Sequence, residues 1–152
     1  MLICFPLYFD TLPYPLIALL EELQSHQELH GERRIIFIVH CGLPEVSHCQ
    51  NALAICKQFA EFMNFIHIAS VVIPDTGAID GGTVEKNKRI TGILDQITEL
   101  INNPCETCIA ETLIAKPSMP PVIFRFFGNM IMKYFAGKNK VSVFQKGYDN
   151  IH

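Results

Sequence analysis

The stretch Met1–Leu20, MLICFPLYFDTLPYPLIALL, decides how the rest of the chain is interpreted. An apolar run over Met1–Phe5 continues into Pro6-Leu7-Tyr8, and a turn marked by further prolines leads into a helix with one apolar face. This order is typical of a strand in an open α/β sheet that carries a loop at its carboxyl end, where such sheets bind ligands. The stretch therefore predicts a ligand-contacting loop.

Segments of strand and helix period alternate along the chain, which favours parallel strands joined by right-handed crossovers. Strands are predicted at Met1–Phe5, Arg33–His40 and Phe65–Ile73, and helices at Pro13–Leu29, Glu45–Asn64 and Val84–Asn102. The intervening Asp75–Thr83, which contains three glycines, is predicted to be a surface loop.

The C-terminal third is less regular. A short helix is predicted around Glu106–Ala115, followed by a stiff connector over Lys116–Pro121. The apolar, aromatic segment Val122–Phe135 resembles a membrane-surface helix, but it has few cations, so we expect it to pack on the sheet or against a neighbouring subunit. Residues 1–152 are predicted to form a single, partial domain in which 104–152 are a C-terminal extension.

The composition restricts the class of protein. Of the 152 residues, 49% are hydrophobic and 18% are charged, as in a chain with a packed core. A net charge of −3 without a block of lysine or arginine gives no reason to expect nucleic acid as a partner. No apolar run approaches the roughly 18 residues of a membrane span. The start lacks a basic region typical of secretory signals, so we expect a cytoplasmic protein with reduced cysteines.

Three stretches resemble one known family, the flavodoxin-like FMN-dependent NAD(P)H oxidoreductases. Phe5–Ile17 is similar to the third strand of that family and its Pro-aliphatic-Tyr loop. Ile36–Glu45 resembles the fourth strand and a Gly-aliphatic-Pro-Glu turn found in a bacterial subgroup. Ala115–Pro121, together with later Gly-Asn and Lys-Asn motifs, resembles the C-terminal extension of that subgroup.

The resemblance implies a flavodoxin-like three-layer α/β sandwich with a parallel sheet. It also implies hydride transfer from NAD(P)H to N5 of FMN and then to an electron acceptor. The cofactor performs this chemistry, so no catalytic side chain is expected. The residues expected to contact the flavin are Pro6, Leu7, Tyr8, Phe9, His40, Cys41 and Gly42.

One part of the family pattern has no counterpart. A family member carries about two further βα units before the position of Met1, and the first holds the FMN phosphate in a Ser/Thr-rich turn at a helix N-terminus. The chain is therefore expected to be a fold truncated at its N-terminus. With the family strand order 2-1-3-4-5, the strand Met1–Phe5 would lie at an edge. We expect this edge to be covered by a homo-oligomer contact or by an N-terminal partner chain.

Other interpretations stay open at this point. The chain can be a non-catalytic assembly module, or a degenerate fragment that folds without cofactor. His40 at the end of a strand can simply bond to the backbone, which we favour slightly over a flavin contact. The pairs His40-Cys41 and His48-Cys49 match no standard zinc spacing, and Cys105-Glu-Thr-Cys108 does not follow the strand that a redox C-x-x-C motif needs.

Overall fold

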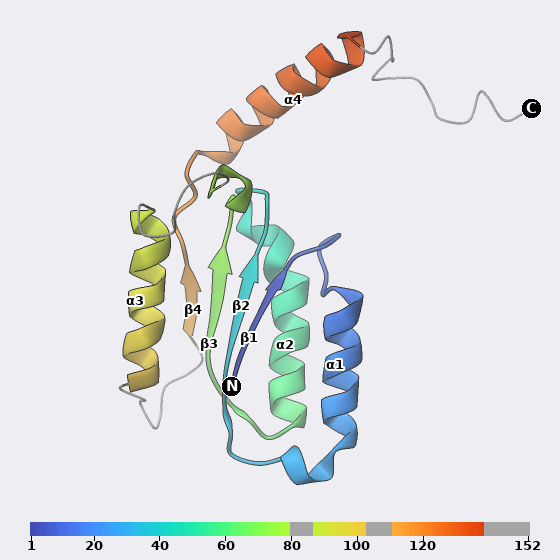
Figure 1. Cartoon of the computed structure of the whole chain (residues 1–152), viewed down its shortest axis with the longest axis vertical. Coiled ribbons are helices and arrows are strands. Elements are labelled where there is room, and N and C mark those ends of the chain that lie inside the picture. Colours follow the sequence, from blue (N-terminus) through green and yellow to red (C-terminus); the bar gives the residue numbers. More distant parts are fainter. Residues whose placement is uncertain (80–86, 103–110, 139–152) are drawn as a thin grey trace, which may run out of the picture. The chain divides into compact units, whose positions relative to one another are not determined.

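The computed structural model describes residues 1–79, 87–102 and 111–138, and these fall into two compact units, Met1–Ser118 and Met119–His152. In the first unit a four-stranded parallel sheet in the order β1-β2-β3-β4 is flanked by helices (Figure 1). The elements are β1 (Leu2–Pro6), α1 (Tyr14–Ser25), β2 (Arg34–His40), α2 (Gln50–Phe62), β3 (Ile66–Ile73), α3 (Lys88–Asn102) and β4 (Glu111–Ile114). Short 3-10 turns occur at η1 (Gln27–Leu29), η2 (Val46–Cys49) and η3 (Thr76–Ile79). The predicted α/β class with a parallel sheet is confirmed.

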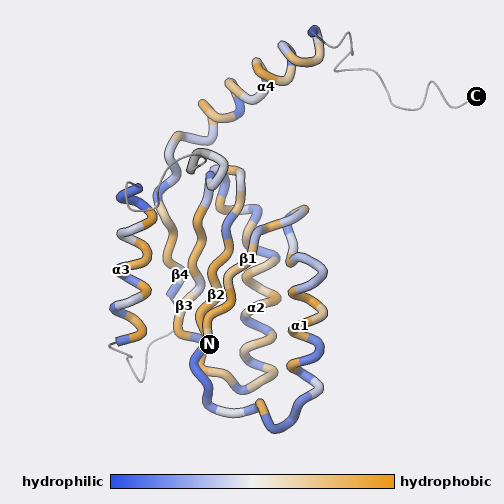
Figure 2. The backbone as a smooth tube through the Cα atoms, in the orientation of Figure 1, coloured by the Kyte–Doolittle hydropathy of each residue, from blue (hydrophilic) through white to orange (hydrophobic). Residues whose placement is uncertain are grey.

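The core lies on both faces of the sheet, and strand β2 shows why. Its residues Ile35, Phe37 and Val39 are buried in a cluster with α1 and α2, whereas Ile36 and Ile38 are buried in a second cluster with α3. A strand that is apolar at every position needs a cover on each face. Figure 2 shows this continuous hydrophobic colouring along the central strands.

The third crossover differs from the first two. Each connection moves to the next strand in the same direction across the sheet, yet α1 and α2 lie on one face and α3 on the other (Figure 1). The connection β3-α3-β4 therefore has the opposite hand, and right-handed crossovers are the strong rule in parallel sheets. As a consequence, no described helix of this unit covers β4 on the α2 side of the sheet.

Strand β1 forms one edge of the sheet, as predicted. It pairs only with β2 among the described strands, from Leu2 opposite Ile36 to Pro6 opposite His40. The N–H of Leu7 points towards β2, so by alternation the outward positions of β1 are Leu2, Cys4 and Pro6. Pro6 has no N–H to offer, and a proline at such a position is a common feature of edge strands.

The prediction of a helix around Glu106–Ala115 is wrong over the described residues. Glu111–Ile114 forms β4, which pairs in parallel with Ala69–Val72 of β3. A segment of only four residues, Glu-Thr-Leu-Ile, carries no clear period, so pairing with β3 decides its conformation. The proposed C-x-x-C motif at Cys105–Cys108 lies outside the described residues. The predicted helix Pro13–Leu29 also ends earlier, at Ser25, and continues as the separate turn η1.

The second unit contains helix α4 (Pro121–Lys138), which includes the predicted apolar segment Val122–Phe135. Pro120 accepts the first backbone bonds of α4 from Ile123 and Phe124, at 3.0 and 3.1 Å. Proline in the first turn of a helix is well tolerated. Large apolar side chains of α4 are exposed on several sides, among them Phe126, Met132 and Tyr134. None of the helices described has the combination of length and hydrophobicity required to cross a bilayer.

Candidate functional site

The ends of β1 and β2 bring the predicted flavin-contacting residues together at the carboxyl edge of the sheet. Pro6 lies opposite His40 in the parallel ladder, and the Leu7 N–H donates to the His40 carbonyl at 2.8 Å. The segments Pro6–Phe9 and His40–Gly42 are therefore neighbours at the position where open α/β sheets bind ligands. We call these two segments the rim.

A tight turn presents two aromatic rings at the rim. Tyr8 and Thr11 exchange backbone hydrogen bonds of 3.3 and 3.0 Å, and the two residues between them, Phe9 and Asp10, have φ of 47° and 59°. Turns with two positive φ angles favour Asn and Gly, so a bulky phenylalanine is strained there. The Phe9 side chain is nevertheless fully exposed, and Tyr8 is 58% exposed. Strain combined with apolar exposure is more typical of a binding loop than of a structural turn.

A polar contact fixes the tip of this turn. Asp10 Oδ1 lies 2.8 Å from Nδ1 of His48, which belongs to η2 before helix α2. From the sequence, His48 was considered only as a metal ligand beside Cys49, and the spacing matched no standard zinc pattern. Within residues 1–79, 87–102 and 111–138, no group of three or more His, Cys, Asp or Glu side chains is placed to hold a metal ion. The contact of His48 with Asp10 instead couples the turn to the start of α2.

The second half of the rim is partly open. A Cβ added at Gly42 would meet no atom within 4 Å, so there is free space beside this residue. The side chain of His40 is half-buried, and burial lowers its pKa. A neutral imidazole is therefore favoured at neutral pH, which suits hydrogen bonding to a flavin edge better than charge stabilisation. Cys41 turns its side chain into the core, so it can face a ligand only through its backbone.

A buried aspartate, Asp75, bonds to chain segments next to the rim. The prediction of a surface loop beginning at Asp75 is wrong at this residue, because Asp75 is only 2% exposed. Its carboxylate accepts hydrogen bonds from the backbone N–H of Ser118, at 3.2 Å, and from the Ser118 hydroxyl. Its own N–H donates to the Leu43 carbonyl at 3.0 Å. Asp75 therefore connects the segment after β2 with the segment after β4.

Arg89 of helix α3 reinforces the same region. One guanidinium nitrogen donates to the carbonyls of Pro74 and Lys116, both at 3.1 Å, and the other to the Asp75 carbonyl at 3.0 Å. Chain segments that leave β3 and β4 are thus held by one side chain. The only sequence signal for this role is an arginine near the start of a helix, which is usually a solvated position.

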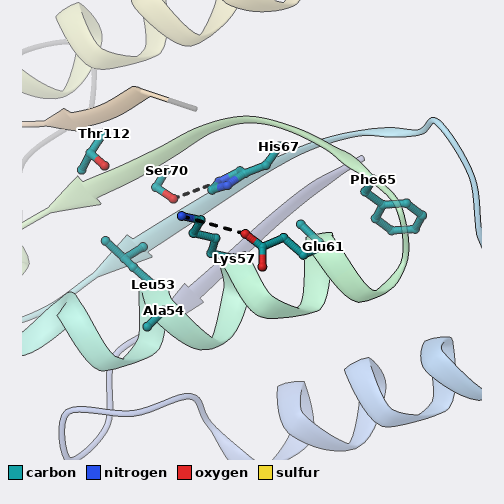
Figure 3. Close-up of a pocket in the computed structure, with 9 residues that line it drawn as sticks. Leu53, Ala54, Lys57, Glu61, Phe65, His67, Ser70 and Thr112 are labelled. Carbon is teal, nitrogen blue, oxygen red and sulfur yellow. Dashed lines mark hydrogen bonds and ion pairs between the residues drawn. The ribbon is translucent and has the colours of Figure 1, made fainter. Parts of the chain in front are cut away.

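A separate recess lies between α2 and the strands β3 and β4, on the α2 side of the sheet, where no described helix of this unit covers β4. It has a volume of about 450 Å³ and is lined by Leu53, Ala54, Lys57, Ala60, Glu61, Phe65, His67, Ser70 and Thr112 (Figure 3). A register shift between β2 and β3 places Ile35 opposite His67 but Ile36 opposite Ala69. This β-bulge brings His67 and Ser70, which would alternate in a regular strand, onto the same face. Their Nε2 and Oγ atoms are 3.0 Å apart.

The polar side chains of the recess include a serine beside a histidine. A serine beside a histidine becomes a nucleophile when an acidic group holds the second ring nitrogen. Here Nδ1 of His67 is buried without a hydrogen bond among the described residues. Burial lowers the pKa of His67, and the nearby Ala69 backbone only partly opposes this. The hydroxyls of Ser70 and Thr112 can donate to a small ligand, and the Lys57 ammonium beside them lies 3.9 Å from the Glu61 carboxylate, which also lines the recess.

Comparisons with protein-family models, curated proteins and solved structures found no significant match, so the site is judged on its geometry. The sequence had suggested Pro6–Phe9 and His40–Gly42 as site residues. It had not suggested His67, Ser70, Arg89 or the pairing of Asp10 with His48. A signal was present for His67 and Ser70, because they are the polar residues of an otherwise apolar strand, Ile66–Ile73.

Proposed function

We propose that this chain supplies the ring-facing rim of a flavodoxin-like FMN site and acts in NAD(P)H-dependent oxidoreduction. The observation that carries the proposal is the Leu7–His40 hydrogen bond of 2.8 Å, which joins the two halves of the rim at the carboxyl edge. Two exposed aromatic rings on a strained turn beside it, and the free space at Gly42, suit a flat, apolar ring system.

The residues present fit the ring of FMN but not its phosphate. Pro6–Phe9 and His40–Gly42 would hold the isoalloxazine through aromatic contact and backbone hydrogen bonds. When bound, FMN would accept a hydride and pass electrons to an acceptor. The sequence has no Ser/Thr-rich turn for the phosphate, so we propose that further βα units, on an N-terminal partner chain, complete the site. Charge-assisted hydrogen bonds to a phosphate contribute roughly 1.5–3 kcal/mol each, so ring contacts alone should bind FMN weakly.

The test is a titration of FMN fluorescence with the whole chain, alone and with an added chain that carries two βα units and a Ser/Thr-rich turn. We expect weak quenching alone and strong quenching with NAD(P)H oxidation after addition. The variants Tyr8→Ala and Gly42→Val should weaken FMN binding about tenfold, by loss of ring contact and by filling the open space. Phe62→Ala is the matched control, because Phe62 is 60% exposed but lies at the opposite end of α2. Equal FMN binding by all variants would contradict the proposal.

A second candidate function is that of a non-catalytic assembly module, and the open edge of β1 favours it. Among the described residues β1 pairs only with β2, so its outward backbone groups have no strand partner there, and the side chains of Leu2 and Cys4 are exposed. We expect self-association through this edge. Cys4→Pro removes an outward N–H and keeps the inward ladder, so it should convert an oligomer into a monomer in analytical ultracentrifugation. A parent that is already monomeric at micromolar concentration would exclude this function.

A further inference from the structure

Two buried thiols meet directly behind the rim. Cys41 follows the last residue of β2, and Cys49 ends η2 at the N-cap of helix α2. Their Sγ atoms are 3.8 Å apart, with the Cys49 thiol directed at the Cys41 sulfur. Cys41 is 4% exposed and Cys49 is fully buried. Neither the spacing of the two residues nor the resemblance to the oxidoreductases suggested this pair.

Backbone hydrogen bonds fix the position of Cys41 next to Cys49. The Cys41 N–H donates to the Ile73 carbonyl at 3.1 Å, and the Cys41 carbonyl accepts from the N–H and the hydroxyl of Thr76 at 2.9 and 3.1 Å. Cys49 is fixed at the junction between η2 and α2. A disulfide needs a sulfur–sulfur distance of about 2.05 Å, so the two side chains have to approach by rotation about their own bonds.

The groups around Cys41 and Cys49 shift the pKa values of the two thiols in opposite directions. The hydrogen bond from Cys49, backbone groups of Leu43 and Asp75, and the proximity of His48 lower the pKa of Cys41, although burial opposes this and the Cys41 thiol itself donates to the Leu43 carbonyl at 3.1 Å. The pKa of Cys49 is raised, chiefly because it donates to Cys41. A thiolate at Cys41 would also lie near the N-terminus of α2, which favours negative charge. An oxidisable thiolate next to a second thiol is the arrangement of a reversible redox pair.

We propose that Cys41 and Cys49 form a reversible intramolecular disulfide, with Cys41 as the thiol that reacts first and a small hydroperoxide as the oxidant. The Cys41 thiolate attacks one oxygen of hydrogen peroxide, the O–O bond breaks, and a sulfenic acid forms with release of hydroxide. Cys49 then attacks the Cys41 sulfur, its proton passes to the departing oxygen, and water leaves as the S–S bond forms. The small exposed fraction of Cys41 selects for an oxidant of this size.

The competing explanation is that both cysteines are merely small apolar core residues. Cys56 provides the internal comparison, because it is also fully buried on α2 and burial raises its pKa to about 12. If burial alone governed reactivity, Cys41 and Cys56 would both resist peroxide. Cys41 belongs to the rim, but the disulfide needs no bound FMN, so peroxide treatment of the flavin-free chain tests it apart from flavin binding.

The experiment treats the whole chain with hydrogen peroxide, blocks the remaining thiols with iodoacetamide, and cleaves after glutamate. Cleavage at Glu45 separates Cys41 from Cys49, so the disulfide appears as two joined peptides that have lost two hydrogens. Fragmentation distinguishes Cys49 from Cys56, and dithiothreitol should restore both peptides. In Cys49→Ser we expect a sulfenic acid at Cys41 that dimedone traps, whereas Cys56→Ser should form the disulfide normally.

A second measurement needs no variant and is made on the parent protein. The alkylation rate of Cys41 should rise at a lower pH than that of Cys56, and at pH 7 it should exceed that of Cys56 at least tenfold. Unchanged, separately alkylated Cys41 and Cys49 after peroxide would overturn the proposal, as would a disulfide of Cys41 with Cys56. Flavin binding is measured separately, on protein without added peroxide, so loss of flavin binding and loss of the disulfide are distinct results.

Discussion

At the rim, the ring of Phe9 is fully exposed on a turn with two positive φ angles, whereas in the recess the imidazole of His67 is half-buried beside a β-bulge. The rim is assembled from segments that follow strands, and a buried network around Asp75 supports it. The recess is assembled within strands and remains open because α3 lies on the other face. Polar side chains at strand ends are thus positioned by the loops that bond to them. Polar side chains within a strand are positioned by the register of the sheet.

The largest effect is expected from removing the support of the rim. Asp75→Ala leaves Ser118 without its acceptor and places alanine at a φ of 57°, so we expect the free energy of unfolding to fall by about 3 kcal/mol. Urea denaturation followed by circular dichroism measures this change. Asp75→Asn keeps an acceptor and tolerates positive φ, and it should cost roughly 1 kcal/mol. Equal stability of both variants and the parent would show that the rim does not rely on Asp75.

An intermediate effect is expected in the recess, and it depends on pH. Burial lowers the pKa of His67 from its ordinary value of 6.5, so its contribution to stability is complete above pH 6.5 and is lost as the pH falls below it. His67→Gln should flatten this acid-side decline, at a cost of about 1 kcal/mol at neutral pH. Denaturation midpoints between pH 4 and 8 test this.

The control for this prediction is His26→Gln. Contacts with Glu28 and Glu22 raise the pKa of His26, so its stabilising contribution is present at low pH and lost as the pH rises. Its removal should therefore change the pH dependence in the opposite direction. An identical slope for His67→Gln and the parent would refute the assignment of acid sensitivity to the recess.

The smallest effect is expected at the turn of the rim, and it has the opposite sign. Phe9→Asn places a residue that accepts positive φ in the strained position, so it should stabilise the fold by roughly 0.5–1 kcal/mol. The thermal midpoint should rise while FMN binding weakens. Phe62→Asn, at a helical position that is 60% exposed, should not raise the midpoint. A lower midpoint for Phe9→Asn would mean that this turn is not strained.

Most of the first unit could be predicted because its signals are local. The β-branched run of β2 and the apolar stripes of α1 to α3 need burial wherever they lie. Their apolar pattern therefore indicates which segments are strands and which are helices. The rim followed from the same signals, because loops at the carboxyl ends of neighbouring parallel strands must meet. Strand β4 escaped prediction, since Glu111–Ile114 is too short to have a period and becomes a strand only by pairing with β3.

The sequence by itself determined a parallel α/β sheet and the proximity of Pro6–Phe9 to His40–Gly42, because these depend on hydrophobic period and strand direction. The edge position of β1 was implied by the resemblance to the oxidoreductases. Only the tertiary structure decided which side chains meet across elements: Cys41 with Cys49, Asp10 with His48, Asp75 with Ser118, and His67 with Ser70. The first three depend on how loops cross the sheet edge, and the last on a single shift of register. Such contacts join residues through space, and no periodicity along the chain encodes them.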